Sequence, residues 1–270
     1  MSANAVQSPP PATLPPSPAT SPAVPPPPVS PWRAGVAAAR ANLIPGIILW
    51  VVAAALVFAY YHAHGLRECL DEVGAWKTRY GVRYTMASSA LFCGLLPWLF
   101  RMALPALRPK RPLAELVHGV VYWGLICCTA DWFYQFQAFA WGDSREPHIV
   151  AVKTACDMLG YTPLIAAPCN ALSHLWRDCN FSWTATRAAF RGAFYRNVVL
   201  PNLVPNWFVW TPGIAVVYCL PATLQLPMAN LICCFWALMC ISIAAESKRP
   251  ATAATTAAGD SSSSCDTDAD

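Results

Sequence analysis

The chain has 270 residues, of which 56% are hydrophobic and only 12% are charged, and its formal net charge is +4. A typical soluble domain has about twice that charged fraction. Residues 197 to 245 form a run of 49 residues without Asp, Glu, Lys or Arg, whereas about 20 apolar residues are enough to cross a bilayer. These features exclude a soluble globular enzyme, a disordered chain and a nucleic-acid-binding protein.

The two ends of the chain differ from its middle. Residues 1–38 are rich in proline, which fixes φ and lacks a backbone donor, so we expect a solvated, disordered tail there. Residues 247–270 are mainly Ala, Thr, Ser and Asp, which bury too little apolar area to fold. The membrane domain is therefore expected at residues 39–246.

Six hydrophobic segments occupy this domain, at about residues 41–61, 84–104, 116–141, 149–175, 197–220 and 222–245. Their apolar residues run continuously instead of alternating, and lipid offers no partner to free backbone groups, so the segments should be helices. The predicted fold class is all-α: a polytopic transmembrane helix bundle of about six spans.

The basic residues between the segments predict an orientation. With a cytoplasmic N-terminus, 12 flanking Lys and Arg residues fall on the inner side and 6 on the outer side. Cytoplasmic flanks carry the excess of positive charge in membrane proteins. Both termini are therefore expected on the inner side.

Residues 182–197 have a different pattern from the spans. Trp183, Phe190 and Phe194 fall on one line of a helix, with Arg187 and Arg191 along its flank. Such a pattern is typical of a helix that lies in the membrane interface, with its aromatic rings down and its arginines toward phosphates. A plain helical linker is the alternative.

One acid, Asp131, lies within the third segment, where a carboxylate costs at least a few kcal/mol. Cys127 and Gln135 stand four residues to either side and extend its helix face as a polar stripe. The stripe is either a pore lining or ion site, or a polar contact that fixes helix packing.

A second polar group lies in the fourth segment. Lys153 and Asp157 are four residues apart and can pair along a helix, with Pro163 about one turn further on. Asp157 and Asp131 are expected at similar depth, so both could form a cluster with Lys153. The alternative is that Lys153 and Asp157 only neutralise each other. We expect the polar interior to be formed by Asp131, Gln135, Lys153, Asp157 and Asn206.

The remaining reactive residues indicate neither an enzyme nor a bound metal or cofactor. The 12 cysteines include adjacent pairs inside the spans but no C-x-x-C, and a thiol in a lipid-facing helix behaves as a small hydrophobe. His62 and His64 lack a third ligand for a metal site. Glycine-rich phosphate loops and hydrolase motifs are missing from the sequence.

Two stretches of the second half resemble a known family. One runs from Lys153 through Asp157 to Pro163, and the other contains Asn206, Trp210 and Pro212, followed by Pro221 and Trp236. In order and spacing they are similar to the family of the twenty-two-kilodalton peroxisomal membrane protein, which includes the mitochondrial inner-membrane Mpv-seventeen protein. Met158 and Gln225 occupy positions where that family has glutamine and arginine.

This resemblance, which covers about residues 117–245, implies a small helical organelle or inner-membrane protein that acts as a channel. The leading hypothesis is therefore a membrane protein that passes, or regulates the passage of, small solutes or ions. A non-conducting membrane scaffold or assembly factor is the alternative. The expected partners are the lipid bilayer and an unidentified small solute or ion, without nucleic acid; a homo-oligomer is left open. The expected location is a bacterial inner membrane, or a mitochondrial inner or peroxisomal membrane.

Overall fold

The structure is a computed structural model that describes residues 31–190 and 194–247. Every regular element in these two ranges is helical. In chain order the elements are α1 (Pro31–Ala41), α2 (Leu43–His62), α3 (His64–Tyr80), α4 (Val82–Ser89), η1 (Ala90–Leu95), α5 (Leu96–Ala103), η2 (Pro105–Leu107), α6 (Pro112–Trp141), α7 (Pro147–Cys156), η3 (Asp157–Ala166), α8 (Ala167–Asp178), α9 (Trp183–Phe190), η4 (Tyr195–Val199), α10 (Leu200–Tyr218) and α11 (Ala222–Ser247).

Five helices are long and apolar enough to cross a membrane: Leu43–His62, Val82–Ala103, Pro112–Trp141, Pro147–Asp178 and Ala222–Ala245. They coincide with five of the six segments predicted from the sequence. Two of them are composite, because the second joins α4, η1 and α5 and the fourth joins α7, η3 and α8. The described part of the chain is thus all-helical, and its five candidate spans are those of a multi-pass membrane protein.

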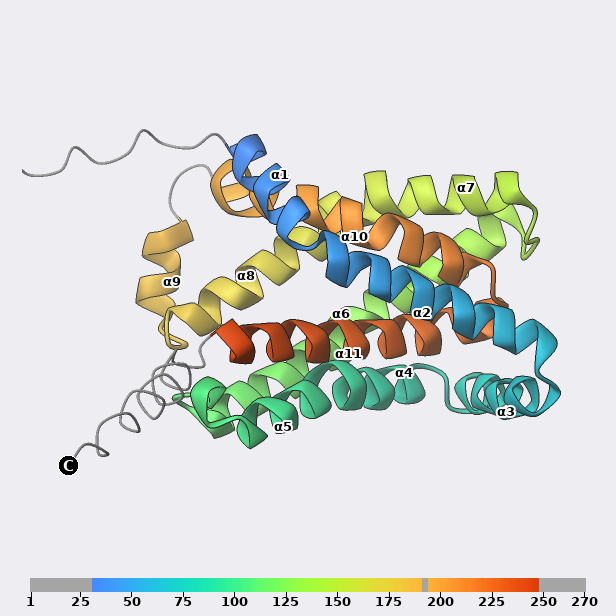
Figure 1. The fold of residues 1–270 in the computed structure, drawn as a ribbon, viewed down its shortest axis with the longest axis horizontal. Helices are drawn as coiled ribbons and strands as arrows, with labels where there is room; N and C mark the ends of the chain where they lie inside the picture. The colour runs from blue at the N-terminus through green and yellow to red at the C-terminus, as the bar shows by residue number, and fades with distance from the viewer. Residues whose placement is uncertain (1–30, 191–193, 248–270) are drawn as a thin grey trace, which may run out of the picture.

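The segment predicted as the fifth span is helical but is not among these five. It forms η4 and α10, and α10 carries Asn202 and Asn206 together with internal Pro205 and Pro212. These polar residues and prolines lower its hydropathy. In the fold, α10 nevertheless runs beside the spans and packs against α1, α2, α7 and α11 (Figure 1).

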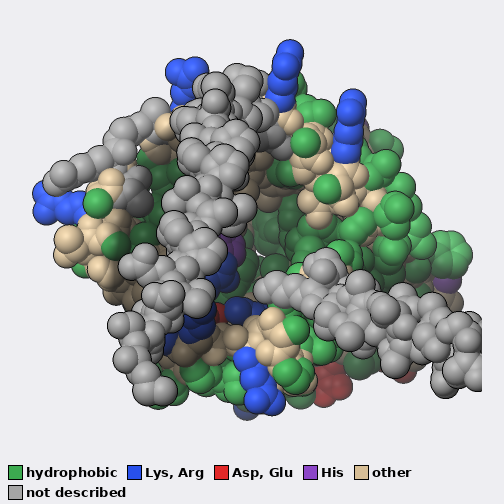
Figure 2. Space-filling model, turned by 60° about the vertical axis from the view of Figure 1, so that its left-hand side comes forward, with side chains coloured by type: hydrophobic (Ala, Val, Ile, Leu, Met, Phe, Trp, Pro, Cys, Tyr) green, Lys and Arg blue, Asp and Glu red, His purple; other side chains and the backbone are tan. Residues whose placement is uncertain are grey.

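The helix ends are arranged at two opposite ends of the molecule. The end of α5, the start of α6, the end of α8 and the end of α11 lie together at the left of Figure 1, and α3 lies at the right. Figure 2 faces the left-hand end, where basic side chains project around the rim and hydrophobic side chains cover the adjoining flank. The flanks assigned to one side of the membrane by charge therefore share one end of the fold.

The main core lies where α2, α10 and α11 meet. Leu49 and Ala53 of α2 pack with Val217 of α10 and with Leu224 and Ile232 of α11. Side chains of α2 also bond to α10, since the Trp50 indole N–H donates to the carbonyl oxygen of Val209 at 2.7 Å. Apolar packing and a backbone hydrogen bond together fix α10 against the first span.

Three segments are wound as π-helices, η1, η3 and η4, a geometry that is rare and often found at functional sites. The longest, η3, contains Pro163, which has no N–H to donate to the residue five positions earlier, Met158. The indole N–H of Trp207 donates to the Met158 carbonyl at 2.6 Å instead. This bond satisfies a backbone group for which lipid has no partner.

The ends of the chain differ in part from the predicted boundaries. Helix α1 begins at Pro31, so residues 31–38 are helical and not part of a tail, and α1 packs against α10. Ser247, predicted as the first residue of the C-terminal tail, is the last residue of α11, and the other residues of the predicted tails lie outside the described ranges. The predicted interfacial segment contains α9, where Trp183 and Phe190 are exposed; Arg191 lies outside the described residues.

Candidate functional site

Asp131 is buried in a tight ionic contact. Its Oδ1 lies 2.6 Å from the Nζ of Lys77, and the Thr85 hydroxyl donates to its Oδ2 at 2.8 Å. The side chains of Lys77 and Asp131 are 8% and 6% exposed. A charge pair this far from water is held only by close geometry and added hydrogen bonds.

The fold brings Lys77 to Asp131 through the turn at Gly81. Helix α3 ends there and α4 begins, and Gly81 has φ 53°, a backbone conformation that glycine adopts without strain. The turn lets α3 pack against α2 and α11 at the end of the bundle, so that Lys77 points inward. Lys77 also donates to the carbonyl oxygen of Ala222 at 3.4 Å.

Asp157 has a separate environment between α6, η3 and α10. The Tyr218 hydroxyl donates to its Oδ2 at 2.8 Å, and the Thr162 hydroxyl donates to its Oδ1 at 3.1 Å. The Gln137 amide in turn donates to the Tyr218 hydroxyl. Asp157 and Thr162 are five residues apart, a spacing that the wider turn of a π-helix brings to one face.

The predicted cluster of Asp131, Lys153 and Asp157 is wrong. Asp131 pairs with Lys77, and no ion pair in the described part of the chain joins Lys153 to either acid. Lys153 is 1% exposed. The two acids separate because Asp131 faces α3 and α4, whereas Asp157 faces α10.

Gln135 is exposed, so its predicted inward position is also wrong. The neighbouring span begins at Val82. Its first turn contains Thr85, which lies at the level of Asp131 because the two side chains are hydrogen-bonded. The next turn of α6, which carries Gln135, extends beyond that neighbour. Gln137 is the glutamine that is fully buried there.

Asn206 is half-buried, and its side-chain oxygen is enclosed without a hydrogen-bond partner. Trp210 and Trp236 pack against the core formed with α2. The remaining predicted motif residues are half-buried prolines in η3, in α10 and just before α11: Pro163, Pro212 and Pro221.

Paired polar side chains occur along most of α6, where it meets α8, η3 and α10. His118 contacts Ser173 at 3.2 Å, Tyr122 donates to Asn170 at 2.6 Å, and the hydroxyls of Thr129 and Tyr161 are 2.8 Å apart. The linked groups of Gln137, Tyr218 and Asp157 continue the series. We call these nine residues the polar row: His118, Tyr122, Thr129, Gln137, Asp157, Tyr161, Asn170, Ser173 and Tyr218.

The polar row extends across most of a membrane. Its members on α6 run from His118 to Gln137, which at about 1.5 Å per residue is about 28 Å along the helix. The hydrocarbon core of a bilayer is about 30 Å thick. The row is therefore long enough to connect the two surfaces.

A third buried polar group was not predicted from the sequence. Asn230 of α11 donates to the hydroxyls of Ser88 and Ser89 at 3.3 and 2.8 Å. Asn230 is recognisable in the sequence as an amide inside an apolar run. Nothing in the sequence around Lys77, Thr85 and Tyr218 indicates that they are buried polar residues. Within the described residues, no group of three His, Cys, Asp or Glu side chains is placed to hold a metal ion.

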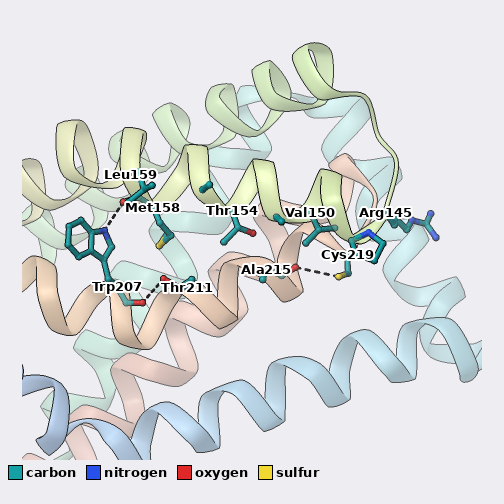
Figure 3. A pocket seen from close by; sticks show the side chains of 12 residues that line it. Arg145, Val150, Thr154, Met158, Leu159, Trp207, Thr211, Ala215 and Cys219 are labelled. Atoms are coloured by element: carbon teal, nitrogen blue, oxygen red, sulfur yellow. Dashed lines mark hydrogen bonds between the residues drawn. The ribbon is translucent and has the colours of Figure 1, made fainter.

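A groove of about 800 Å³ lies between α7–η3 and α10. Figure 3 shows Arg145 at one end of it and Trp207 at the other, with Thr154 and Ala215 between them on facing helices. Most of the lining is apolar.

No known protein family matches the sequence, and neither a curated protein nor a solved structure is similar to it.

Proposed function

We propose that this protein spans the membrane six times, with α10 as the fifth crossing, and passes protons along the polar row. The observation that supports the proposal is the row itself. It places four groups of hydrogen-bonded side chains at intervals along α6, over about the thickness of the hydrocarbon core.

The residue types in the row suit a proton better than a metal cation. Hydroxyl and imidazole groups both donate and accept hydrogen bonds, so each can receive a proton on one side and release one on the other, and the amides of Asn170 and Gln137 hold two of these hydroxyls in place. A hard cation needs about six oxygen ligands at one place, and the row has two or three polar groups at each level. Asp157 is the row's acid and can hold the proton in transit.

The Lys77–Asp131 pair is outside this row and has another part in the proposal. Its two charges neutralise each other beside the path, and Thr85 completes the contact. We assign it to holding α3 and α4 against α6, so that the interface along the row stays closed to lipid.

The family resemblance supports passage of a small species as a second argument. Its two motif stretches contact each other, because Trp207, next to Asn206, donates to Met158, next to Asp157. Asp157 also accepts a hydrogen bond from Tyr218, and Trp210 packs against the core cluster that contains Tyr218. Membership of that family is part of the proposal.

The test measures proton flux into liposomes that contain the purified full chain and a trapped pH-sensitive dye, driven by a potassium diffusion potential. We expect flux above that of empty liposomes. Asp157→Asn should lower it at least about tenfold, because a positioned acid or base contributes about a hundredfold or more to a proton transfer.

Asp178→Asn is the matched control, since Asp178 is an exposed acid at the end of the same composite helix. It should leave the flux unchanged. The unfolding temperatures of both variants are measured as well. If they are equal, the lower flux of Asp157→Asn is due to lost conduction and not to lost folding. Flux no higher than in empty liposomes would contradict the proposal and favour the non-conducting scaffold.

A further inference from the structure

The groove between α7–η3 and α10 opens on the outside of the bundle. Its wall includes Ala151, Ala155, Leu159 and Thr211, and all four of these residues are exposed. In a protein with membrane-spanning helices, that surface faces lipid. The groove is therefore accessible from the bilayer.

The position of the groove matches one leaflet of a bilayer. Arg145, at its mouth, lies two residues before Pro147, where the fourth span begins. Leu159, at its other end, lies 12 residues further along the helix, which is about 18 Å. Half of the hydrocarbon thickness is about 15 Å.

Arg145 has free hydrogen-bonding capacity at this mouth. Its guanidinium lies over the ring of Tyr61 at 5.0 Å, and no hydrogen bond or ion pair to it occurs among the described residues. The nearby acid Glu146 contacts His148 at 3.3 Å, and Asp143 is the other acid of the loop. The planar N–H groups of an arginine match the geometry of a phosphate.

One polar atom in the wall of the groove lacks a partner. Thr154 is 7% exposed, it lines the groove, and its hydroxyl is enclosed without a hydrogen bond (Figure 3). A buried hydroxyl without a partner is energetically unfavourable, and an acceptor on a ligand would relieve this cost. The ligand that fits the groove thus has an apolar body and a hydrogen-bond acceptor partway along it.

We propose that the groove binds one phospholipid, with its phosphate at Arg145, an ester carbonyl oxygen accepting from Thr154, and one acyl chain extending toward Trp207. Charge complementarity supports the phosphate, and the length and apolar lining support the chain. This proposal depends on the protein lying in a membrane, but it does not depend on proton passage.

The test is photolabelling of the full chain in liposomes by phosphatidylcholine and phosphatidylglycerol that carry the same diazirine in one acyl chain. Labelled peptides are identified by mass spectrometry. We expect both lipids to label residues 147–159 and 207–219 more strongly than the exposed faces of α2 and α6. Ala155→Trp, which fills the groove from an exposed position, should abolish the excess.

Ala54→Trp is the matched control, because Ala54 is an exposed alanine of the α2 span away from the groove. It should leave the labelling unchanged. Arg145→Gln should lower the labelling by both lipids about tenfold, as expected for loss of a charge-assisted hydrogen bond.

Three results would overturn the proposal. The first is that the groove is labelled no more strongly than other lipid-facing surfaces. The second is that the labelling survives Ala155→Trp. The third is that a fatty acid with the same diazirine labels the groove as strongly as the phospholipids do. Proton flux is measured on the same liposomes, so that a failure of lipid binding is distinguished from a failure of proton passage.

Discussion

At the residue scale, the structure depends on buried charges that have found partners. Lys77 and Asp131 are each more than nine-tenths buried and 2.6 Å apart. Burial of either charge alone costs several kcal/mol, and their attraction offsets this cost only while both are present. Loss of one partner should therefore harm the fold more than loss of both.

Lys77→Met tests this dependence. We expect it to lower the free energy of unfolding by about 3–5 kcal/mol, because Asp131 is left buried with only Thr85 as a hydrogen-bond partner. The double variant Lys77→Met with Asp131→Asn should recover at least half of the loss, since no charge is then stranded. The measurement is the unfolding midpoint in mixed detergent micelles titrated with sodium dodecyl sulfate.

Arg79→Met supplies the comparison, because Arg79 is an exposed basic residue near the end of the same helix. It should change the midpoint little, as expected for a surface charge. If the double variant were less stable than Lys77→Met alone, the pair would not be the reason for the loss.

The sequence predicted the important acids but not their partners. Asp131 and Asp157 stood out as charges inside apolar segments, and both are buried. Lys77 lies 54 positions before Asp131, in a segment that resembles an ordinary basic loop, so its contact depends on the turn at Gly81. The spacing from Asp131 predicted Gln135 to face inward, and this prediction failed because helical spacing alone does not reveal where a neighbouring helix ends.

At the element scale, hydrophobic runs predicted five helices within a few residues of their observed bounds. The π-helical segments were not predicted, because their geometry depends on contacts such as that of Trp207 with Met158. The same contact explains how a helix with a proline inside it remains continuous in lipid. Small residues, in turn, determine how closely two helices can approach each other.

Two helices approach each other closely where η1 meets α6. A Cβ placed on Gly94 would lie 2.9 Å from the carbonyl oxygen of Gly119, so only glycine fits between these backbones. Such small-residue contacts hold membrane helices together by close packing. The contact also keeps Ser89, one turn earlier, within reach of Asn230.

Gly94→Val should therefore destabilise the protein by about 1–3 kcal/mol or more, the usual effect of overpacking. Gly160→Val is the matched change, because Gly160 also lies in a π-helical segment but a Cβ there meets no atom within 4 Å. The same detergent titration should separate the two variants clearly. Equal loss in both would mean that the cost arises from the segments' backbone and not from the contact with Gly119.

At the scale of the whole molecule, the crossings determine which surface each site faces. The start of α7 lies at the end of the bundle that carries α3, opposite the end where α5 and α8 finish (Figure 1). Arg145, at the mouth of the groove, precedes α7 and lies over Tyr61 near the end of α2. If α10 crosses the membrane, the turn between α10 and α11 lies at the α3 end as well. The polar row then runs from His118 at one surface to Gln137 near the other.

The packing of α10 favours such a crossing. Val209 and Val217 of α10 belong to the same core as Leu49 of α2 and Ile232 of α11, and both of those helices are candidate spans. A helix that packs along two spans lies at the same depth as they do. The asparagines and prolines of α10 lower its hydropathy below that of the five candidate spans, but α10 still packs within the bundle.

Labelling by a membrane-impermeant maleimide checks this arrangement. In sealed vesicles of each orientation, we expect Cys69, an exposed residue of α3, and Cys179, which follows α8, to react from opposite sides. In a Thr223→Cys variant, the exposed position 223 at the start of α11 should react together with Cys69, because α10 returns the chain to that side. Reaction of position 223 together with Cys179 would mean that α10 does not cross, and Tyr218 could not then meet Asp157 inside the membrane.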